Sequence, residues 1–334
     1  MSKIPGIRIG DLHYDRALFM GPMEGITDVP FRKLIRKHGC GITCTQMIHA
    51  EGLLRGFESR RMQETSCMTE QEHPVGFQLA GCKPDIMAEA AKKVQSMGAS
   101  FIDINMGCPA KSVVANGSGS ALLQKPSLAA EIVKAMKKEV SIPITAKIRA
   151  GWNESMKNYL DMGALLEEAG VALVSVHART RAQKFSGHAN WDLIAQLKKH
   201  LSIPVVGNGD VFFPEDVEDM FDQTQADGVM MARGVLGNPW LFSQTIPTVE
   251  NIYQTLFDHL DDHLSFYEHR DRAMLTFRKH IVWYTHGLSG AAKFRKELFG
   301  ERDNDVLLKK LKDFFEKLDP QSTPDQHERK SQSQ

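Results

Sequence analysis

The chain has 334 residues, 42% hydrophobic and 25% charged, which is the balance of a water-soluble protein with one large domain and a smaller one. Its 41 Lys and Arg residues equal its 41 Asp and Glu residues, so local basic patches and not the overall field would have to hold a nucleic acid. Five cysteines without C-x-x-C spacing argue against a structural zinc and a disulfide scaffold. The first ten residues lack the apolar core of a signal peptide, and no apolar run reaches the roughly 18 residues of a membrane span. We therefore expect a cytoplasmic protein with no membrane segment and no metal.

Short apolar runs predict the strands of a parallel sheet. Residues 7–19 alternate and turn at Gly10 and Asp11, which predicts a hairpin that closes one end of a barrel. The predicted main strands are 17–23, 42–48, 75–80, 101–106, 144–149, 173–177, 205–209 and 228–233.

Segments of helical period separate most of these strands, with Pro84, Pro126 and Pro214 marking helix starts. Eight strands that alternate with amphipathic helices predict an α/β fold, the (β/α)8 or TIM barrel. A doubly wound sheet is the alternative. No G-x-G-x-x-G follows the first strand, so the sequence does not support a dinucleotide-binding domain of that type.

After Trp240 the strand pattern stops and helical periodicity takes over. Apolar residues of helical spacing lie at 252–264, 274–288 and 307–318, and the segment from residue 320 is polar. We expect a catalytic barrel at 1–242, a small all-helical domain at 243–319 and a disordered tail at 320–334.

The segment 102–126 contains Cys108 between Gly107 and Pro109, at the end of a predicted strand. Glycines there allow a close approach between backbone and ligand, so the sulfur of Cys108 could face a bound molecule. The alternative is a buried cysteine that only packs, as most free cysteines do.

Other polar side chains also interrupt the apolar runs at predicted strand ends, where barrel enzymes place their chemistry. They are Gln78, Asn105, Lys147, Arg149, His177, Arg179, Asn208, Asp210 and Arg233. Each has an ordinary explanation as a hydrogen-bonded structural group. Together they are hard to explain by packing, because a buried lysine is costly without an anionic partner.

Glycines at the ends of the last two strands predict a phosphate site built from backbone N–H groups. They are Gly207, Gly209 and Gly234. A phosphate-bearing cofactor there would place its ring near Gln78 and Lys147, an arrangement suited to tuning a flavin.

Sequence motifs along the whole barrel resemble those of the tRNA-dihydrouridine synthases. The matching pieces are G-P-M-E-G-I-T-D-V-P-F-R (21–32), F-Q-L-A-G (77–81), D-I-N-M-G-C-P-A-K (103–111), G-S-A-L-L (119–123), A-K-I-R-A-G-W (146–152), V-H-A-R-T-R (176–181), N-G-D (208–210) and A-R-G-V-L-G-N-P-W (232–240). F-R-K-H-I-V-W-Y (277–284) and G-A-A-K-F-R (290–295) resemble the bacterial branch that includes synthase B.

The resemblance implies an enzyme that uses FMN, reduced by NADPH or NADH, to convert a tRNA uridine, expected in the D-loop, to 5,6-dihydrouridine. It implies that Cys108 donates a proton to C5 of uracil while the flavin gives hydride to C6. A cysteine side chain is mainly a thiol at neutral pH and suits that role. The residues that the resemblance assigns to FMN are Pro22, Met23, Gln78, Lys147, His177, Asn208, Gly209, Asp210, Arg233 and Gly234.

A tRNA substrate also requires contacts to phosphates and a base drawn out of its stack. The candidate RNA contacts are Asn105, Arg179, Arg181, Arg278, Lys279, His280, Lys293 and Arg295. The ordinary alternative for the basic ones is a solvated helix face. Glu24 and the segment 113–118 depart from the family pattern, which affects the choice of uridine and not the reaction.

Two other functions remain open at this stage. One is an FMN-dependent reductase of free pyrimidines or other small enones, and the other is a non-catalytic RNA-binding protein that keeps the barrel as a scaffold. We expect a monomer.

Overall fold

The computed structural model describes residues 4–56, 58–326 and 328. It divides into two compact units, the first comprising the chain up to residue 211 with 215–232, and the second comprising 212–214 and the chain from 233. The division at 232 lies earlier than the boundary at 242 expected from the sequence, so Arg233 and Gly234 belong to the second unit.

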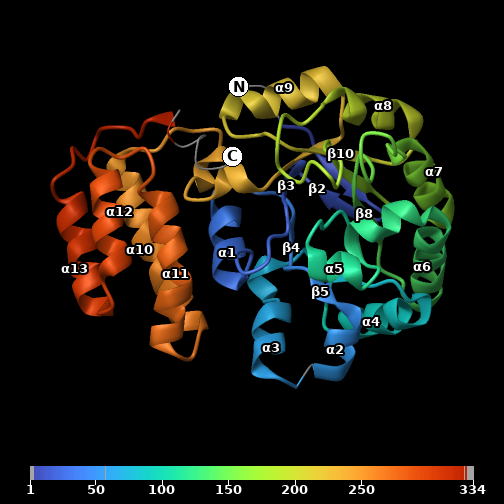
Figure 1. Cartoon of the computed structure of the whole chain (residues 1–334), viewed down its shortest axis with the longest axis horizontal. Coiled ribbons are helices and arrows are strands. Elements are labelled where there is room, and N and C mark those ends of the chain that lie inside the picture. Colours follow the sequence, from blue (N-terminus) through green and yellow to red (C-terminus); the bar gives the residue numbers. More distant parts are fainter. Residues whose placement is uncertain (1–3, 57, 327, 329–334) are drawn as a thin grey trace. The chain divides into compact units, whose positions relative to one another are not determined.

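The first unit is a parallel β-barrel (Figure 1). Within its described residues the strands follow the order β3-β11-β10-β9-β8-β7-β6-β4. A parallel bridge between Phe19 and Ile42 links the two ends of this series, and Met20 N–H donates to the Ile42 carbonyl oxygen at 2.9 Å. The strands are β3 (Leu18–Met20), β4 (Thr43–Cys44), β6 (Val75–Ala80), β7 (Phe101–Met106), β8 (Ile144–Arg149), β9 (Val174–His177), β10 (Val205–Asn208) and β11 (Gly228–Met231). The predicted TIM barrel is confirmed, and the doubly wound sheet is excluded.

The predicted strand 42–48 is instead two short strands, β4 and β5 (Ile48–His49), both paired with β6. The break occurs at Thr45, which contacts Gln78 of β6 through its side chain. Its hydroxyl oxygen accepts the N–H of Gln78 at 3.1 Å, taking the place of a backbone acceptor in the ladder.

Helices cover the outside of the barrel, as α4, α6, α7 and α8 do in Figure 1. Proline occupies the first position of α4, α6 and α9, where its missing N–H costs no hydrogen bond. The helices are α1 (Val29–Lys37), α2 (Ala50–Gly56), α3 (Arg60–Ser66), α4 (Pro84–Ser96), α5 (Lys111–Ala115), α6 (Pro126–Glu139), α7 (Tyr159–Ala169), α8 (Asp192–His200) and α9 (Pro214–Thr224), with 3₁₀ turns η1 (Glu70–Glu72) and η2 (Gly119–Gln124).

The predicted hairpin is present as β1 (Ile7–Ile9) and β2 (Leu12–Tyr14), paired antiparallel. Ile7, Ile9 and Tyr14 are buried in one cluster with residues from the starts of the barrel strands. The amino-terminal end of the barrel is therefore closed by this cluster, and a cavity of about 20 Å³ lies there, room for little more than a water molecule. The opposite end of the barrel is left for a ligand.

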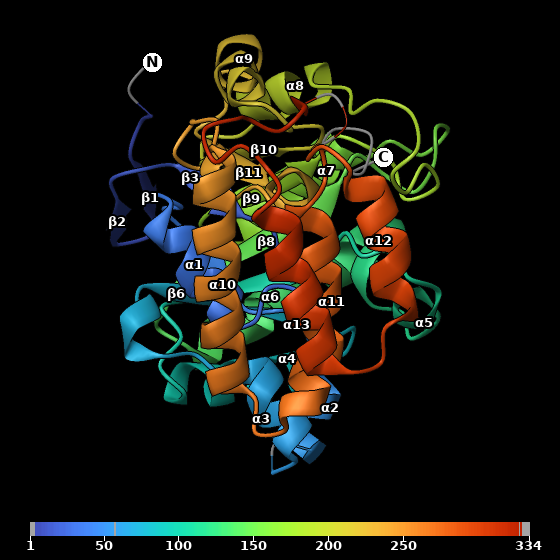
Figure 2. The same ribbon diagram turned by 90° about the vertical axis from the view of Figure 1, so that its left-hand side faces the viewer.

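The second unit is helical, with α10, α11 and α13 running alongside one another in Figure 2. Its helices are α10 (Val249–Phe266), α11 (Arg270–Tyr284), α12 (Ala291–Gly300) and α13 (Asn304–Phe315), preceded by η3 (Arg233–Val235) and η4 (Pro239–Leu241). Helix α12 was not predicted from the sequence. Among its described residues, the buried ones are Ala291, Phe294 and Leu298. Within the described part of the chain, no helix is both long and apolar enough to cross a membrane.

The start of the expected disordered tail is ordered in the structure. Val249 N–H donates to the Ser322 carbonyl at 2.9 Å, and Asp325 N–H donates to the Gly287 carbonyl at 2.8 Å. Disorder was expected from residue 320 because the segment has little apolar content. Backbone hydrogen bonds instead anchor its first residues to the helical unit. Residues 327 and 329–334 lie outside the described residues.

Candidate functional site

A chain of side-chain hydrogen bonds links β6 and β7 inside the barrel. Gln78 donates from Nε2 to Asp103 at 2.7 Å and accepts at Oε1 from Asn105 at 2.9 Å. Thr145 on β8 donates to the other carboxylate oxygen of Asp103 at 2.7 Å. Gln78 is 1% exposed, so this network is part of the barrel interior and fixes the orientation of Asn105.

Asn105 in turn positions Cys108. Its Oδ1 accepts the N–H of Gly107 at 3.2 Å and that of Cys108 at 2.9 Å. From η2, the Ser120 hydroxyl donates to the Cys108 carbonyl at 2.8 Å. Gly119 has φ +60°, and a Cβ there would lie 3.2 Å from the Cys108 Cβ. The backbone of Cys108 is thus held on two sides, while its side chain stays half-buried at the end of β7.

Lys147 on β8 lies beside Asn208 on β10. Its Nζ donates to Asn208 Oδ1 at 3.0 Å, and Asn208 Nδ2 donates to the Met230 carbonyl at 2.8 Å. Burial, with a smaller contribution from Arg149, lowers the pKa of Lys147 to about 8. The residue as a whole is half-buried at the strand end, and a nearby negative charge would stabilise its protonated form.

Arg149 is one of the polar residues predicted at the strand ends, with no specific role assigned to it from the sequence; it follows Lys147 by two positions and so shares its side of the strand. Its Nε donates to the Gly107 carbonyl at 2.7 Å, and one terminal nitrogen donates to the Lys184 carbonyl at 2.7 Å. Arg149 is 3% exposed. It therefore ties the Cys108 loop to the loop after β9.

His177 ends β9 and is buried beside Arg179. The His177 Nε2 atom lies 3.4 Å from a guanidinium nitrogen of Arg179. Arg179 also forms a 2.8 Å ion pair with Asp210, whose same oxygen accepts the Ala189 N–H at 2.7 Å. The 2% exposure of Arg179 contradicts its prediction as a phosphate contact. Asp210 is already neutralised by Arg179, so the pair positions the loops after β9 and β10.

Gly209 lies between Asn208 and Asp210 in a conformation that only glycine tolerates. Its φ is +128°, and an added Cβ would lie 2.7 Å from the Ala189 Cβ and 3.2 Å from His177 Cδ2. At Gly209 the rim is therefore formed by the backbone, with no side chain.

The loop after β3 carries Pro22 and Met23, both half-buried. The Thr27 hydroxyl accepts the Met23 N–H at 3.1 Å, and Gln46 accepts the Gly25 N–H at 2.5 Å. Asp28 caps α1 by accepting the Phe31 N–H at 3.1 Å. The motif 21–32 is thus a strand end, a tied loop and a capped helix, with Glu24 exposed.

Arg233 and Gly234 lie in η3 of the second unit, directly after the end of β11 in sequence. The Arg233 guanidinium carbon lies 5.9 Å from the centre of the Phe212 ring. Both residues are half-buried.

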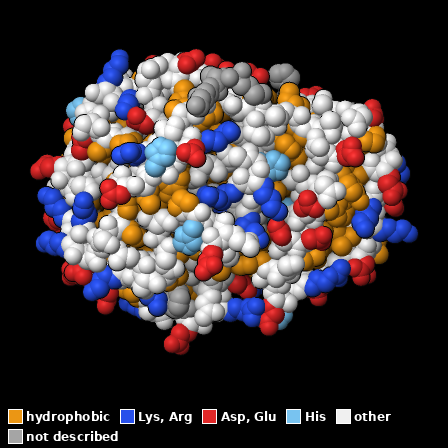
Figure 3. All heavy atoms as spheres, turned by 180° about the vertical axis from the view of Figure 1, so that it is seen from behind, with side chains coloured by type: hydrophobic (Ala, Val, Ile, Leu, Met, Phe, Trp, Pro, Cys, Tyr) orange, Lys and Arg blue, Asp and Glu red, His pale blue; other side chains and the backbone are white. Residues whose placement is uncertain are grey.

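The RNA candidates fall into two groups. His280 is 1% exposed, and burial lowers its pKa well below the ordinary value, so the neutral ring is not a phosphate contact and that prediction is wrong. Arg181, Arg278, Lys279, Lys293 and Arg295 keep partial or full exposure. The face shown in Figure 3 mixes Lys and Arg with Asp and Glu.

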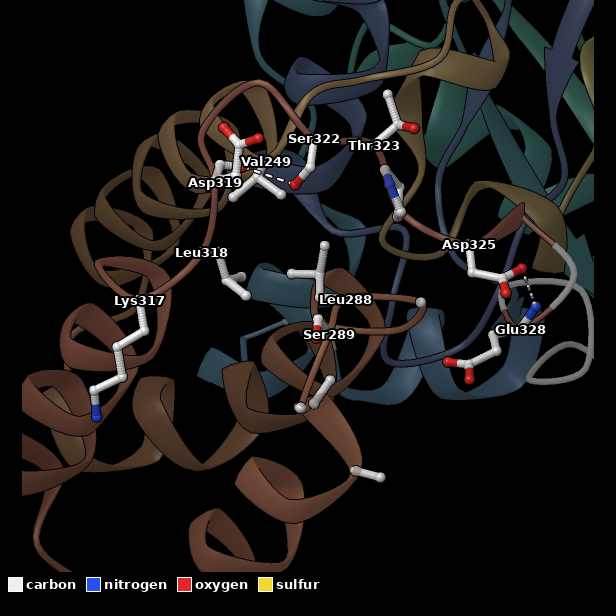
Figure 4. Close-up of a pocket in the computed structure, with 15 residues that line it drawn as sticks. Val249, Leu288, Ser289, Lys317, Leu318, Asp319, Ser322, Thr323, Asp325 and Glu328 are labelled. Carbon is white, nitrogen blue, oxygen red and sulfur yellow. Dashed lines mark hydrogen bonds between the residues drawn. The ribbon is translucent and has the colours of Figure 1, made fainter.

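Two further cavities differ in their chemistry. The one in the helical unit (Figure 4) has a volume of about 780 Å³ and is bordered by Asp319, Asp325 and Glu328 against Lys317, which does not suit a phosphate. The other, of about 340 Å³, lies at the ends of β5 and β6. No group of three His, Cys, Asp or Glu side chains among the described residues is placed to hold a metal.

The geometry defines an α/β barrel enzyme whose polar groups converge at the carboxyl ends of its strands, around a half-exposed cysteine and a lysine with a lowered pKa. A family model described as "Dihydrouridine synthase (Dus)" matches residues 19–319. The chain belongs to the dihydrouridine synthase family.

Named relatives match nearly the whole chain. It is 37% identical over 321 residues to a "Probable tRNA-dihydrouridine synthase" of Rickettsia prowazekii (strain Madrid E), covering 92% of this chain and 97% of the relative. It is 36% identical over 323 residues to "tRNA-dihydrouridine synthase B" of Pseudomonas aeruginosa, covering 92% and 96%.

Solved structures share the fold at low identity. An old yellow enzyme homologue from Zymomonas mobilis matches with a TM-score of 0.52 at 14% identity, over 72% of this chain and 90% of the other. Histamine dehydrogenase from Rhizobium sp. 4-9 matches with a TM-score of 0.55 at 16% identity, over 78% and 51%. These matches support the barrel architecture.

Proposed function

We propose that this enzyme reduces a D-loop uridine of tRNA to 5,6-dihydrouridine, with FMN as its cofactor and NADPH or NADH as the reductant, and that Cys108 is the proton donor. The observation that carries the proposal is the half-buried Cys108 at the end of β7, next to the Lys147 strand, in a member of the dihydrouridine synthase family. Relatives of similar length are named tRNA-dihydrouridine synthases.

The residues present fit a flavin ring. Burial destabilises the positive charge of Lys147. An electron-rich flavin ring beside the ammonium group would stabilise that charge. His177 ends β9, which is the neighbour of the Lys147 strand, and Met23 follows β3 at the same end of the barrel. At Gly209 there is no side chain, and an added Cβ would meet Ala189. Gln78 uses one hydrogen of Nε2 and one lone pair of Oε1 in the network, so its second Nε2 hydrogen remains as a donor for the ring.

The phosphate and ribityl chain are assigned to residues that follow β10 and β11. Asn208 and Gly209 follow or end β10, while Arg233 and Gly234 follow β11. Asp210 is assigned a positioning role, because its carboxylate is paired with Arg179.

The chemistry divides between cofactor and chain. When bound, the reduced flavin supplies the hydride that C6 of uracil accepts. Cys108 gives its thiol proton to C5, and solvent then restores that proton. Asn105 and Arg149 hold the Cys108 loop through its backbone groups, so the sulfur keeps a defined position relative to the rim.

The tRNA itself is assigned to the basic residues that keep partial or full exposure. Arg181 lies at the rim, with its guanidinium carbon 4.4 Å from the centre of the Trp152 ring. The helical unit contributes Arg278, Lys279, Lys293 and Arg295. They would contact phosphates while the target base is drawn out of its stack.

Purified protein tests this proposal against its alternatives. A flavin absorption spectrum and NADPH-dependent formation of dihydrouridine in tRNA, mapped by sequencing, are the expected results. Faster turnover of free uracil or uridine would instead favour a small-molecule reductase. A protein that binds tRNA but takes up no FMN would favour a scaffold without catalysis.

A further inference from the structure

The cavity of about 340 Å³ lies on the same rim as Cys108. It is formed by His49 at the end of β5, by Cys82 and Lys83 just after β6, and by Glu51 in α2. Asn116 and Ser118, from the segment that follows the Cys108 loop in the chain, form the facing wall, and Ala80, Gly81 and Ile86 complete the lining. Since β6 and β7 are neighbouring parallel strands, both strand ends open on one edge of the barrel.

The wall of this cavity is tied to the Cys108 loop and to the cavity floor. The Cys82 thiol donates to the Asn116 carbonyl at 3.1 Å, and Gly117, at φ +75°, would place a Cβ only 3.3 Å from that sulfur. Two residues beyond the wall, Ser120 donates to the Cys108 carbonyl at 2.8 Å. A group bound in the cavity would therefore lie beside the segment that holds the Cys108 backbone.

Glu51 and Lys83 give the cavity its charged edge. Glu51 Oε1 and Lys83 Nζ are 2.8 Å apart, and the two side chains are 43% and 63% exposed. Arg55 lies 3.6 Å from Oε2, which is beyond hydrogen-bond distance. An exposed pair of this kind adds little to stability, so the fold does not require it. The pair presents two acceptor oxygens next to a cationic donor.

We propose that this cavity binds the guanine base of a nucleotide next to the target uridine, with Glu51 and Lys83 reading its edge. Guanine presents two neighbouring donors, N1–H and N2–H, beside the acceptor O6. The donors match the two oxygens of Glu51, and O6 matches Lys83, as in other bidentate contacts to carboxylates. Adenine has one donor at that edge and leaves a carboxylate oxygen unused. The volume lies at the lower end of small-ligand pockets.

This inference rests on the proposed function, because it needs an RNA substrate. Drawing the target base out of its stack removes the stacking partner of the neighbouring base, which then gains from a pocket of its own. Glu51 and Lys83 would contribute to substrate recognition and leave the reduction step to Cys108.

The test uses tRNA transcripts that carry guanosine, inosine or adenosine on each side of the mapped uridine. Inosine differs from guanosine only by the missing 2-amino group. We expect kcat/KM of the wild type to fall about tenfold with inosine at one flank, the size of a lost hydrogen bond to a charged group. Glu51→Gln and Lys83→Met should lower kcat/KM on guanosine transcripts about tenfold, and Glu51→Gln should no longer distinguish guanosine from inosine.

Glu139→Gln and Lys92→Met are matched controls, because that ion pair is 3.1 Å long, with side chains 43% and 58% exposed, and lies outside the cavity. They should behave as wild type, and all variants should keep their flavin. Dihydrouridine formation that is indifferent to both flanking bases, or unchanged discrimination in Glu51→Gln, would overturn this inference alone. A wild type that forms no dihydrouridine in any RNA would overturn the proposed function, and this inference with it.

Discussion

The barrel rim and the helical unit both bury polar side chains, but they use them differently. At the rim, Gln78, Asp103 and Asn105 are joined by hydrogen bonds of 2.7–2.9 Å. In the helical unit, His259 and His280 are each 1% exposed and meet edge to face, with ring centres 4.7 Å apart. The rim is organised by a continuous chain of side-chain hydrogen bonds. The helix interior packs its histidines in an aromatic cluster with Phe277. Within that cluster His259 has a hydroxyl partner in Tyr284 at 3.2 Å, and His263 has one in Thr276 at 2.9 Å.

The difference shows what a buried polar residue can signify. A hydrogen-bonded network fixes the direction of each donor and acceptor, which a reacting group needs. Ring packing buries area and sets a preference for the neutral imidazole, but it aims no proton at a ligand. We therefore expect substitutions at the rim to affect activity, and substitutions in the histidine cluster to affect stability.

The largest effect is expected at Cys108. Cys108→Ala should lower the rate of dihydrouridine formation by at least about 10²-fold, since a positioned general acid contributes that much. The flavin spectrum and the thermal unfolding midpoint should stay unchanged. Cys67→Ala, a half-buried cysteine elsewhere in the first unit, is the matched control. Full activity in Cys108→Ala would remove this thiol from the mechanism.

The Arg179–Asp210 pair should give the next effect, on stability. Asp210→Asn leaves Arg179 buried without its counter-charge, which should lower the free energy of unfolding by about 3 kcal/mol in urea titrations. Asp305→Asn breaks a 2.7 Å pair whose side chains are 53% and 79% exposed, and should cost less than about 1 kcal/mol. Equal losses in the two variants would show that burial of the rim pair does not matter.

His280 should make the helical unit sensitive to acid. Its folded pKa lies well below the ordinary 6.5, with His259, His263 and Lys279 adding to the effect of burial. Between the two values the unfolded chain binds more protons, so stability falls as the pH falls below 6.5. His280→Phe should match wild type at pH 8 and be more stable by about 2 kcal/mol at pH 5.

The control for that measurement is His269→Phe, because the His269 side chain is 71% exposed. It should follow the wild-type curve at both pH values. A His280→Phe protein that loses as much stability in acid as the wild type would show that this ring is not the source.

Lys147 should give the smallest effect, at alkaline pH. Its folded pKa of about 8 lies below the ordinary 10.5, so the unfolded chain binds more protons between these values and stability rises with pH. In the flavin-free protein the wild type should gain about 1 kcal/mol over Lys147→Met between pH 8 and 9.5, after allowance for partial exposure. Lys134→Met, an exposed residue of α6, should show no such difference. Parallel curves for wild type and Lys147→Met would contradict the lowered pKa.

Much of the barrel was predictable because each strand is encoded by a short apolar run of consecutive residues. The bounds of β6, β7 and β8 agree with the predicted runs, and the hairpin β1–β2 lies where Gly10 and Asp11 predicted a turn. The predicted strand 42–48 was wrong in one respect, because a distant residue, Gln78, pairs with the Thr45 side chain. Helix α12 was not predicted because it is short and few of its described residues are buried and apolar, so its sequence shows only weak helical periodicity.

The sequence by itself determined the fold class, the order of the strands along the chain and the residues that follow each strand, since periodicity and turn chemistry are local properties. Only the tertiary structure decided which basic residues face solvent. Arg179 and His280 are buried although their residue types favour exposure, because Asp210 pairs with the first and aromatic rings enclose the second. It also decided that Arg149 supports the Cys108 loop and that Glu51 and Lys83 meet beside it. Contacts between residues far apart in the chain depend on the closed barrel, and no local pattern contains them.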